Sequence, residues 1–205
     1  MEETKAKKSY YIISALVILI LVAIDQITKY FIYTNMTPYK DEKKVLGNAL
    51  VIYFIKNTGA AWGSLSNKTI FLLVISILLV ILLSYVYHNA TKYPHLKAAR
   101  ICIVFIIGGA IGNMIDRIRF HYVVDFIYVK LINFPIFNFA DICVTVCMFI
   151  LLFLFIFKYK SEDIELLLHG KIRESVDSKE KESDEANLDE ANSEKTNLEE
   201  TNSEE

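Results

Sequence analysis

The sequence predicts an all-α membrane protein with four transmembrane helices and a small β element. Hydrophobic residues make up 54% of the 205-residue chain and charged residues only 22%, an apolar share above that of ordinary soluble domains. Four segments also reach the length of roughly 20 apolar residues that a helix needs to cross a bilayer core. These predicted spans are residues 10–33, 69–87, 98–118 and 137–157.

The first predicted span follows a short basic segment, residues 1–9. A basic segment before an apolar run also begins a cleavable signal peptide, but no small-residue cleavage site follows Ile24. The chain continues instead with Asp25, Gln26 and Thr28. We therefore expect the first span to be a retained membrane anchor.

The connection between the first two spans contains the predicted β element. Residues 45–55 are rich in Val, Ile, Tyr and Phe and are interrupted by Gly47. This composition favours short strands lying on the outer membrane surface. We expect an extracytoplasmic, strand-rich segment at 36–67.

The C-terminal end of the chain differs from the rest in composition. Residues 174–205 hold 13 Asp or Glu and three Lys, a net charge of -10, and they contain almost no apolar residues. Such a stretch is expected to be disordered. An even number of spans places both termini on one side, which we predict to be the cytoplasm. The predicted parts are an N-terminus at 1–9, a four-span domain at 10–160 and an acidic tail at 161–205.

Cysteine and histidine usage disfavours a metal site or a disulfide framework. The chain has three cysteines, an odd number, and all of them lie in apolar stretches. Its four histidines stand apart, without the Cys and His spacing of a metal site. We expect no metal, no organic cofactor and no nucleic-acid partner.

Four acidic residues lie where a bilayer disfavours them. A carboxylate near the centre of the membrane costs about 2.5 to 3.5 kcal/mol even on a lenient scale. Asp25, Asp116 and Asp141 lie in or at the ends of three predicted spans, and Asp125 lies in an apolar patch between the last two. Each acid alone is also explained as a snorkelling or capping residue at a helix end.

Two of these acids are accompanied by asparagines at helical spacing. Asn113 precedes Asp116 by three residues, and Asn138 precedes Asp141 by three, so each pair shares one helix face. Both pairs are expected at the same membrane surface, where the short loop also holds Asp125. Two adjacent carboxylates share a proton, so that one can activate water while the other polarises a peptide carbonyl. The pattern indicates an aspartic protease.

The sequence leaves two candidates for the partner of Asp141. Both Asp125 and Asp116 lie within reach of the same surface. We favour Asp125, because Asp116 directly precedes Arg117 and lies one turn after Asn113, where a salt-bridged helix end is sufficient to explain it.

Two other classes of function compete with a protease. A proton-coupled carrier would use membrane acids to mark an ion path. The acids here cluster toward one surface, and none lies in the second span, which favours a site over a path. A non-catalytic scaffold would act through its acidic tail, and deletion of residues 174–205 would then abolish its function.

Five short motifs carry a resemblance to a known family. They are DQITK at 25–29, NTGAAWG at 57–63, GGAIGNMIDR at 108–117, VVDF at 123–126 and FPIFNFAD at 134–141. In this order and spacing the chain resembles lipoprotein signal peptidase, the signal peptidase II family, over roughly residues 10–158. The resemblance implies a bacterial plasma-membrane endopeptidase that cleaves diacylglyceryl-modified prolipoproteins just before the lipidated cysteine. It also implies sensitivity to the cyclic peptide globomycin.

The resemblance assigns roles to individual residues. The catalytic dyad falls on Asp125 and Asp141. The implied partners are diacylated prolipoprotein and membrane lipid, and a monomer is expected because one chain holds every motif. The other positions are Asn113 and Asn138, which would hydrogen-bond in the site, Asn57 and Arg117, which would help hold the substrate, and Asp25 and Asp116, which would support it.

Overall fold

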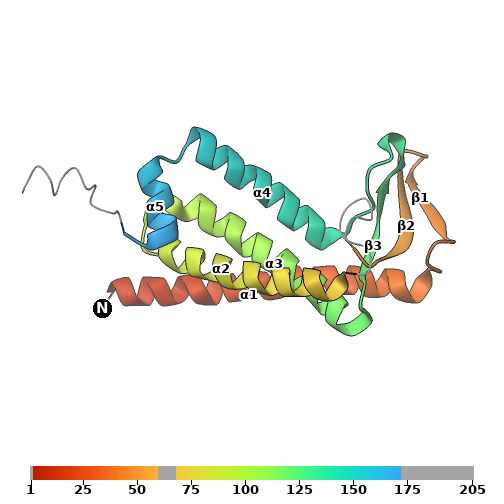
Figure 1. Cartoon of the computed structure of the whole chain (residues 1–205), viewed down its shortest axis with the longest axis horizontal. Coiled ribbons are helices and arrows are strands. Elements are labelled where there is room, and N and C mark those ends of the chain that lie inside the picture. Colours follow the sequence, from red (N-terminus) through yellow and green to blue (C-terminus); the bar gives the residue numbers. More distant parts are fainter. Residues whose placement is uncertain (1, 60–67, 172–205) are drawn as a thin grey trace, which may run out of the picture. The chain divides into compact units, whose positions relative to one another are not determined.

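Among the described residues of the computed structural model, four helices are long and apolar enough to cross a membrane, which confirms the predicted number of spans. The structure describes residues 2–59 and 68–171, with side chains from residue 8 onward. The helices are α1 (Glu2–Asn35), α2 (Thr69–Ala90), α3 (Lys97–Phe120), α4 (Phe139–Phe157) and α5 (Ser161–His169), with short 3-10 turns at Pro94–Leu96 and Lys130–Ile132 (Figure 1).

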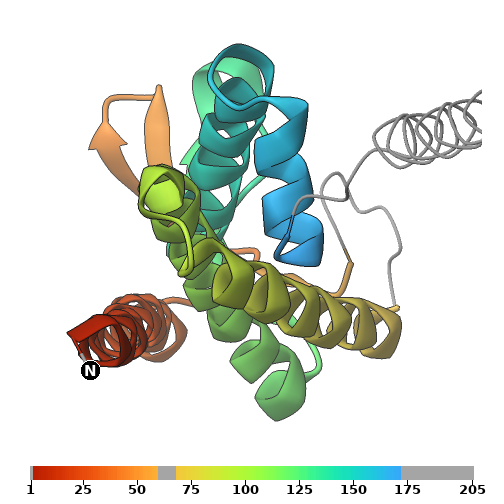
Figure 2. The ribbon, with the colours of Figure 1, turned by 90° about the vertical axis from the view of Figure 1, so that its left-hand side faces the viewer.

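Helix α3 is the central helix of the spans. It packs against α1, α2 and α4. In an apolar stretch of 18 residues, 67% of the residues of this span are buried, whereas no residue of the corresponding stretch of α2 is buried. Figure 2 shows α1 and α4 on different sides of α3. Buried Ile103 and Ile106 of α3 belong to one apolar core with Leu151 and Leu154 of α4. The polar residues near the end of α3 are thus held between helices rather than in lipid.

Two glycines let neighbouring helices approach α3 closely. A Cβ at Gly109 would lie 2.5 Å from the carbonyl oxygen of Ala140 on α4, and one at Gly112 would lie 2.5 Å from Oδ2 of Asp25 on α1. Neither contact is sterically possible, so both positions require a residue without a side chain. The close approach brings the start of α4 and the Asp25 region of α1 to the same part of α3.

The sheet consists of β1 (Glu42–Leu46), β2 (Leu50–Asn57) and β3 (Val123–Val129), antiparallel in the order β1-β2-β3. The hairpin of β1 and β2 turns at Gly47, whose φ of +53° favours glycine, and it confirms the strands predicted at 45–55. Strand β3, which was not predicted, comes from the connection between α3 and α4. The β element is therefore shared by two loops.

The sheet lies at the end of the spans where α1 and α3 finish, opposite α5 (Figure 1). Phe54, Val124 and Phe126 from the sheet form a second apolar cluster with Met36, just beyond α1. The hydroxyl of Thr69 at the start of α2 donates to the carbonyl oxygens of residues 58 and 121. These contacts fix the sheet against the ends of the helices.

Helix α5 lies beyond the predicted end of the four-span domain at residue 160. Leu166 and Leu167 are buried in the main core, and the Asn89 side chain of α2 donates to the Leu167 carbonyl at 3.1 Å. The compact unit runs to Gly170 and includes α5, whereas the sequence predicts a four-span domain at 10–160. Helix α5 was not predicted, because its acidic residues give the segment the composition of the acidic tail although it also has an apolar face. The predicted acidic stretch 174–205 lies outside the described residues.

Candidate active site

A cleft of about 320 Å³ lies where α3, α4 and the sheet meet. Its apolar wall is formed largely by residues 134–137, which lead into α4. Five residues predicted from the sequence supply most of its polar lining. They are Asn57, Asn113, Arg117, Asp125 and Asp141.

Asp141 is positioned by the start of α4. Asn138 is the N-cap residue, and its Oδ1 accepts from the Asp141 backbone N–H at 3.0 Å. The Asp141 Oδ2 in turn accepts from the Asn138 backbone N–H at 3.1 Å. This reciprocal capping fixes the Asp141 carboxylate at a helix N-terminus, where the helix dipole favours negative charge.

Asp125 is positioned by β3 and is only 1% exposed. Its Oδ2 accepts from the side-chain amide of Asn57 at 2.7 Å, and its Oδ1 accepts from that of Asn138 at 2.7 Å. Burial, and then repulsion from Asp141, raise the pKa of Asp125 from 3.8 to about 7, although the two amide hydrogen bonds oppose the shift. Near neutral pH Asp125 is therefore able to hold a proton.

Two asparagines connect the two acids. The Asn138 amide donates to Asp125 and also to the side-chain oxygen of Asn113 at 3.0 Å, and the Asn113 amide donates to Oδ1 of Asp141 at 2.8 Å. Asn138 is fully buried, so its amide has no competing water. This asparagine bridge, Asn113 and Asn138, fixes both carboxylates relative to one cleft.

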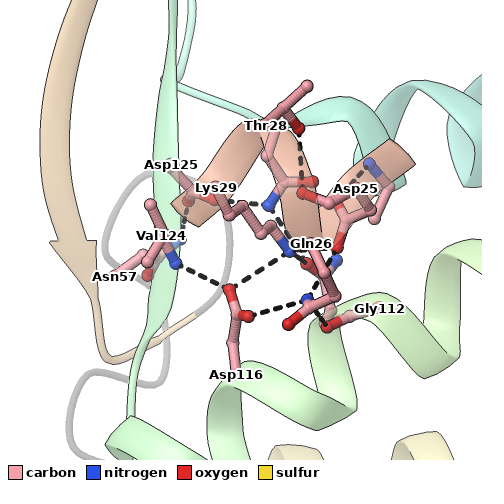
Figure 3. A network of polar contacts seen from close by, with 12 residues as sticks. Asp25, Gln26, Thr28, Lys29, Asn57, Gly112, Asp116, Val124 and Asp125 are labelled. Carbon is pink, nitrogen blue, oxygen red and sulfur yellow. Dashed lines mark hydrogen bonds and ion pairs between the residues drawn. The ribbon is translucent and has the colours of Figure 1, made fainter. Parts of the chain in front are cut away.

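Asp116 lies outside the cleft, in a buried cluster with α1 (Figure 3). Its carboxylate lies 3.2 Å from Nζ of Lys29 and accepts from Gln26 Nε2 and from the Val124 backbone N–H, each at 3.0 Å. Asp25 belongs to the same cluster, with its Oδ2 2.8 Å from the Lys29 ammonium. The salt bridge expected for Asp116 at this end of α3 is thus made with Lys29 of α1.

Sequence reasoning did not assign a role to Lys29, whose side chain is only 3% exposed. Besides its two ion pairs, Nζ of Lys29 donates to Oδ1 of Asn113 at 2.8 Å, which joins the acid cluster to the asparagine bridge. The available signal was the spacing of Asp25 and Lys29 at i and i+4 in an apolar span. Thr145, which lies four residues after Asp141 and lines the cleft, was also missed.

The spans contain three free, buried cysteines, Cys102, Cys143 and Cys147. Among residues 8–59 and 68–171, no three His, Cys, Asp or Glu side chains are arranged as a group that could hold a metal ion. The chemistry that the described residues offer is that of paired carboxylates beside amides and a cation.

Comparison with known proteins matches this chain to one family. The family model described as signal peptidase (SPase) II matches residues 17–157. Proteins named lipoprotein signal peptidase are similar, including one from Enterococcus faecalis with 38% identity over 71% of this chain and 88% of its own length. Another, from Staphylococcus haemolyticus, is 41% identical over 68% of this chain and 89% of its own.

Two solved structures also match, both described as bacterial membrane enzymes studied by the in meso method. The first has a TM-score of 0.63 and 35% identity, and the match covers 70% of this chain and 87% of that one. The second has a TM-score of 0.62 and 34% identity, with 71% and 94% covered.

Proposed function

Since the chain belongs to the signal peptidase II family, it is a membrane protease that removes signal peptides from prolipoproteins, and we propose that Asp125 and Asp141 carry out the hydrolysis. The supporting observation is that these two acids line one cleft and are joined through the asparagine bridge. Asp116, the other candidate from the sequence, supports the site from a separate cluster.

In the first step, protonated Asp125 donates a hydrogen bond to the carbonyl oxygen of the scissile peptide and transfers its proton to that oxygen as water attacks. Asp141 takes a proton from a water molecule held between the acids, and the oxygen of that water attacks the carbonyl carbon. The Asn113 amide, which donates to Oδ1 of Asp141, holds this carboxylate in place for this step. The product is a tetrahedral intermediate without a covalent link to the enzyme.

In the second step, the tetrahedral intermediate collapses and the carbon–nitrogen bond breaks. The leaving amine receives the proton that Asp141 took from water, and a hydroxyl of the intermediate returns a proton to the dyad. One carboxylate ends protonated and the other ionised, so the pair is ready for another turnover.

The surrounding polar residues have supporting roles in this proposal. Asn57 holds the second oxygen of Asp125, and Arg117, which also lines the cleft, offers a cation to backbone oxygens of the substrate. Asn113 and Asn138 orient the two acids. Asp25 and Asp116 fix α1 against α3, and Asp25 also accepts from the backbone N–H of residue 140 at the start of α4.

We place the substrate with its signal helix among the spans and its diacylglyceryl chains in lipid, so that the cysteine lies at the cleft. The apolar wall at 134–137 faces such a substrate, and residues 36–59 of the segment predicted at 36–67 cover the site. Residues 60–67 lie outside the described residues. In this arrangement the cleft lies at the outer surface of the plasma membrane and both termini are cytoplasmic. Globomycin would occupy the same substrate site. We also propose that the enzyme is a monomer.

Cleavage of a diacylated prolipoprotein peptide by the detergent-purified protein tests the assignment. We expect Asp125→Asn and Asp141→Asn to lose cleavage by about 10³-fold or more, since each removes a proton donor or acceptor of the reaction. Asp116→Asn should keep measurable turnover in the fraction that folds. An inactive but folded Asp116→Asn beside an active Asp125→Asn would reverse the assignment.

A further inference from the structure

A second cavity, of about 310 Å³, lies at the end of the spans opposite the active site. Its walls come from α1 and α3, with Tyr87 of α2. Two cations line it, Lys97 and Arg100, both in the first turn of α3. Among the residues that the structure describes, the cavity shares no lining residue with the proposed active site.

Arg100 is a buried cation with unused hydrogen-bond donors. Its side chain is 7% exposed, its Nη1 donates to the Ala90 carbonyl at 3.3 Å, and its guanidinium lies 4.4 Å from the centre of the Tyr10 ring. A guanidinium has five N–H groups, and every fully buried side-chain nitrogen in the described residues has a partner. The remaining donors of Arg100 therefore keep access to the cavity that it lines.

The charge of this cation pair is not balanced within the part of the chain that the structure describes. No carboxylate there forms an ion pair with Lys97 or Arg100. The first turn of α3 also lacks an acidic residue. The helix dipole disfavours cations at this position and favours an anion. A bound anion would satisfy both the cations and the helix terminus.

The rest of the cavity is apolar and borders the lipid. Val17, Val104 and Phe105 line its depth, and half-exposed Ile13 and Ile101 lie at its lipid-facing side. Two of the three hydroxyl-bearing residues in its walls already contact each other, because the Ser14 and Tyr87 oxygens lie 2.6 Å apart. The cavity thus offers an anion site at one end and a surface for hydrocarbon beside it.

We propose that this cavity binds an anionic phospholipid, with the phosphate at Lys97 and Arg100 and the start of an acyl chain along the α1 and α3 walls. Basic pockets between transmembrane helices suit such headgroups. In the proposed orientation the lipid belongs to the cytoplasmic leaflet. The inference does not depend on which acids cleave the substrate.

Native mass spectrometry of the detergent-purified full chain tests this proposal. The protein is titrated with phosphatidylglycerol and with phosphatidylcholine of the same acyl chains. We expect one phosphatidylglycerol to bind more tightly than phosphatidylcholine and Lys97→Gln to weaken its binding about fivefold, the effect of one cation near a lipid phosphate. Arg100→Gln should weaken it further. Lys158→Gln, which removes an exposed cation at the end of α4 outside the cavity, should not.

Three outcomes would overturn the proposal. Equal affinity for the two lipids would show that the cavity does not recognise an anionic headgroup. Equal effects of Lys97→Gln and Lys158→Gln would show that general surface charge, and not a site, binds the lipid. Displacement of the lipid by glycerol phosphate at concentrations matching those of the lipid would show a site for a free anion. Since Lys97 is exposed, its variant decides the matter even if Arg100→Gln fails to fold.

Discussion

At the scale of single residues, Asp125 gives the enzyme a predictable pH dependence. The proposed mechanism needs this carboxyl group protonated, and its pKa is raised to about 7 by burial and by Asp141. The protonated form dominates below that pH and is lost above it. We expect kcat/KM to fall as pH rises through about 7, approaching a tenfold fall per unit. A rate that stays constant up to pH 9 would contradict a proton-donating role for Asp125.

Asn57 should influence the pH at which kcat/KM falls, which is the alkaline limb of the pH profile. Its amide donates to Asp125 at 2.7 Å and favours the ionised form, so it lowers the pKa of that group. In Asn57→Ala we therefore expect the limb to move to higher pH, by under about one unit for one hydrogen bond.

The control for this experiment is Thr145→Val. Thr145 lines the same cleft, and no hydrogen bond joins it to Asp125 among the described residues. This substitution should change the rate without moving the limb. A profile that shifts equally in both variants would mean that the limb reports substrate binding instead of the ionisation of Asp125.

Much of the candidate site at this scale was predictable from the sequence. Asn113, Asn138 and Asp141 stand out because amides and acids recur at spacing three in apolar spans. The expected shared helix face is wrong for Asn138, which is the N-cap residue before α4 and meets Asp141 through reciprocal capping. The role of Lys29 was not predictable, because its contacts to Asp116 and Asn113 join helices more than 80 residues apart in the chain. Sequence spacing contains no information on that packing.

At the scale of elements, the contact between α3 and α4 determines whether the asparagine bridge forms. Gly109→Ala would place a Cβ 2.5 Å from the backbone oxygen of Ala140, which cannot rotate away. We expect a loss of about 1 to 3 kcal/mol of stability from overpacking. The start of α4 would also move away from α3, so cleavage should fall as Asp141 separates from Asn113.

Gly108→Ala is the matched comparison, one residue earlier on α3. Its Cβ would lie 2.9 Å from Cδ1 and 3.2 Å from Cβ of Leu21, a side chain that can adjust. We expect a smaller loss of stability and nearly full cleavage. Thermal unfolding in detergent compares the stability of the two variants, and peptide cleavage compares their activity. A Gly108→Ala variant that loses more stability and activity than Gly109→Ala would contradict this view of the helix contact.

The element that the sequence analysis missed, β3, shows a limit of periodicity arguments. Its residues 123–129 read VVDFIYV, almost continuously apolar, so the alternation of a half-exposed strand is absent. Its first four residues are all buried, because the strand packs on β2 and against the helix ends. The hairpin of β1 and β2 was easier to predict, since Gly47 interrupts its β-forming residues.

At the scale of the whole molecule, helix α5 belongs to the compact unit that holds the four spans. The compact unit ends at Gly170, and Leu166 and Leu167 of α5 are buried in its core. Truncation after residue 160 removes both side chains, and we expect a loss of at most about 3 to 6 kcal/mol. Truncation after residue 173 keeps them and should leave the unfolding temperature unchanged.

The same two truncations distinguish a protease from a scaffold that acts through its acidic tail. If the reaction belongs to the cleft, the protein truncated after residue 173 cleaves prolipoprotein peptide at the full rate, because the described residues that line the cleft all lie before residue 146. The shorter form should lose activity only as it loses folded protein, which its unfolding curve measures. Loss of cleavage in a fully folded protein truncated after residue 173 would instead make the tail part of the working enzyme.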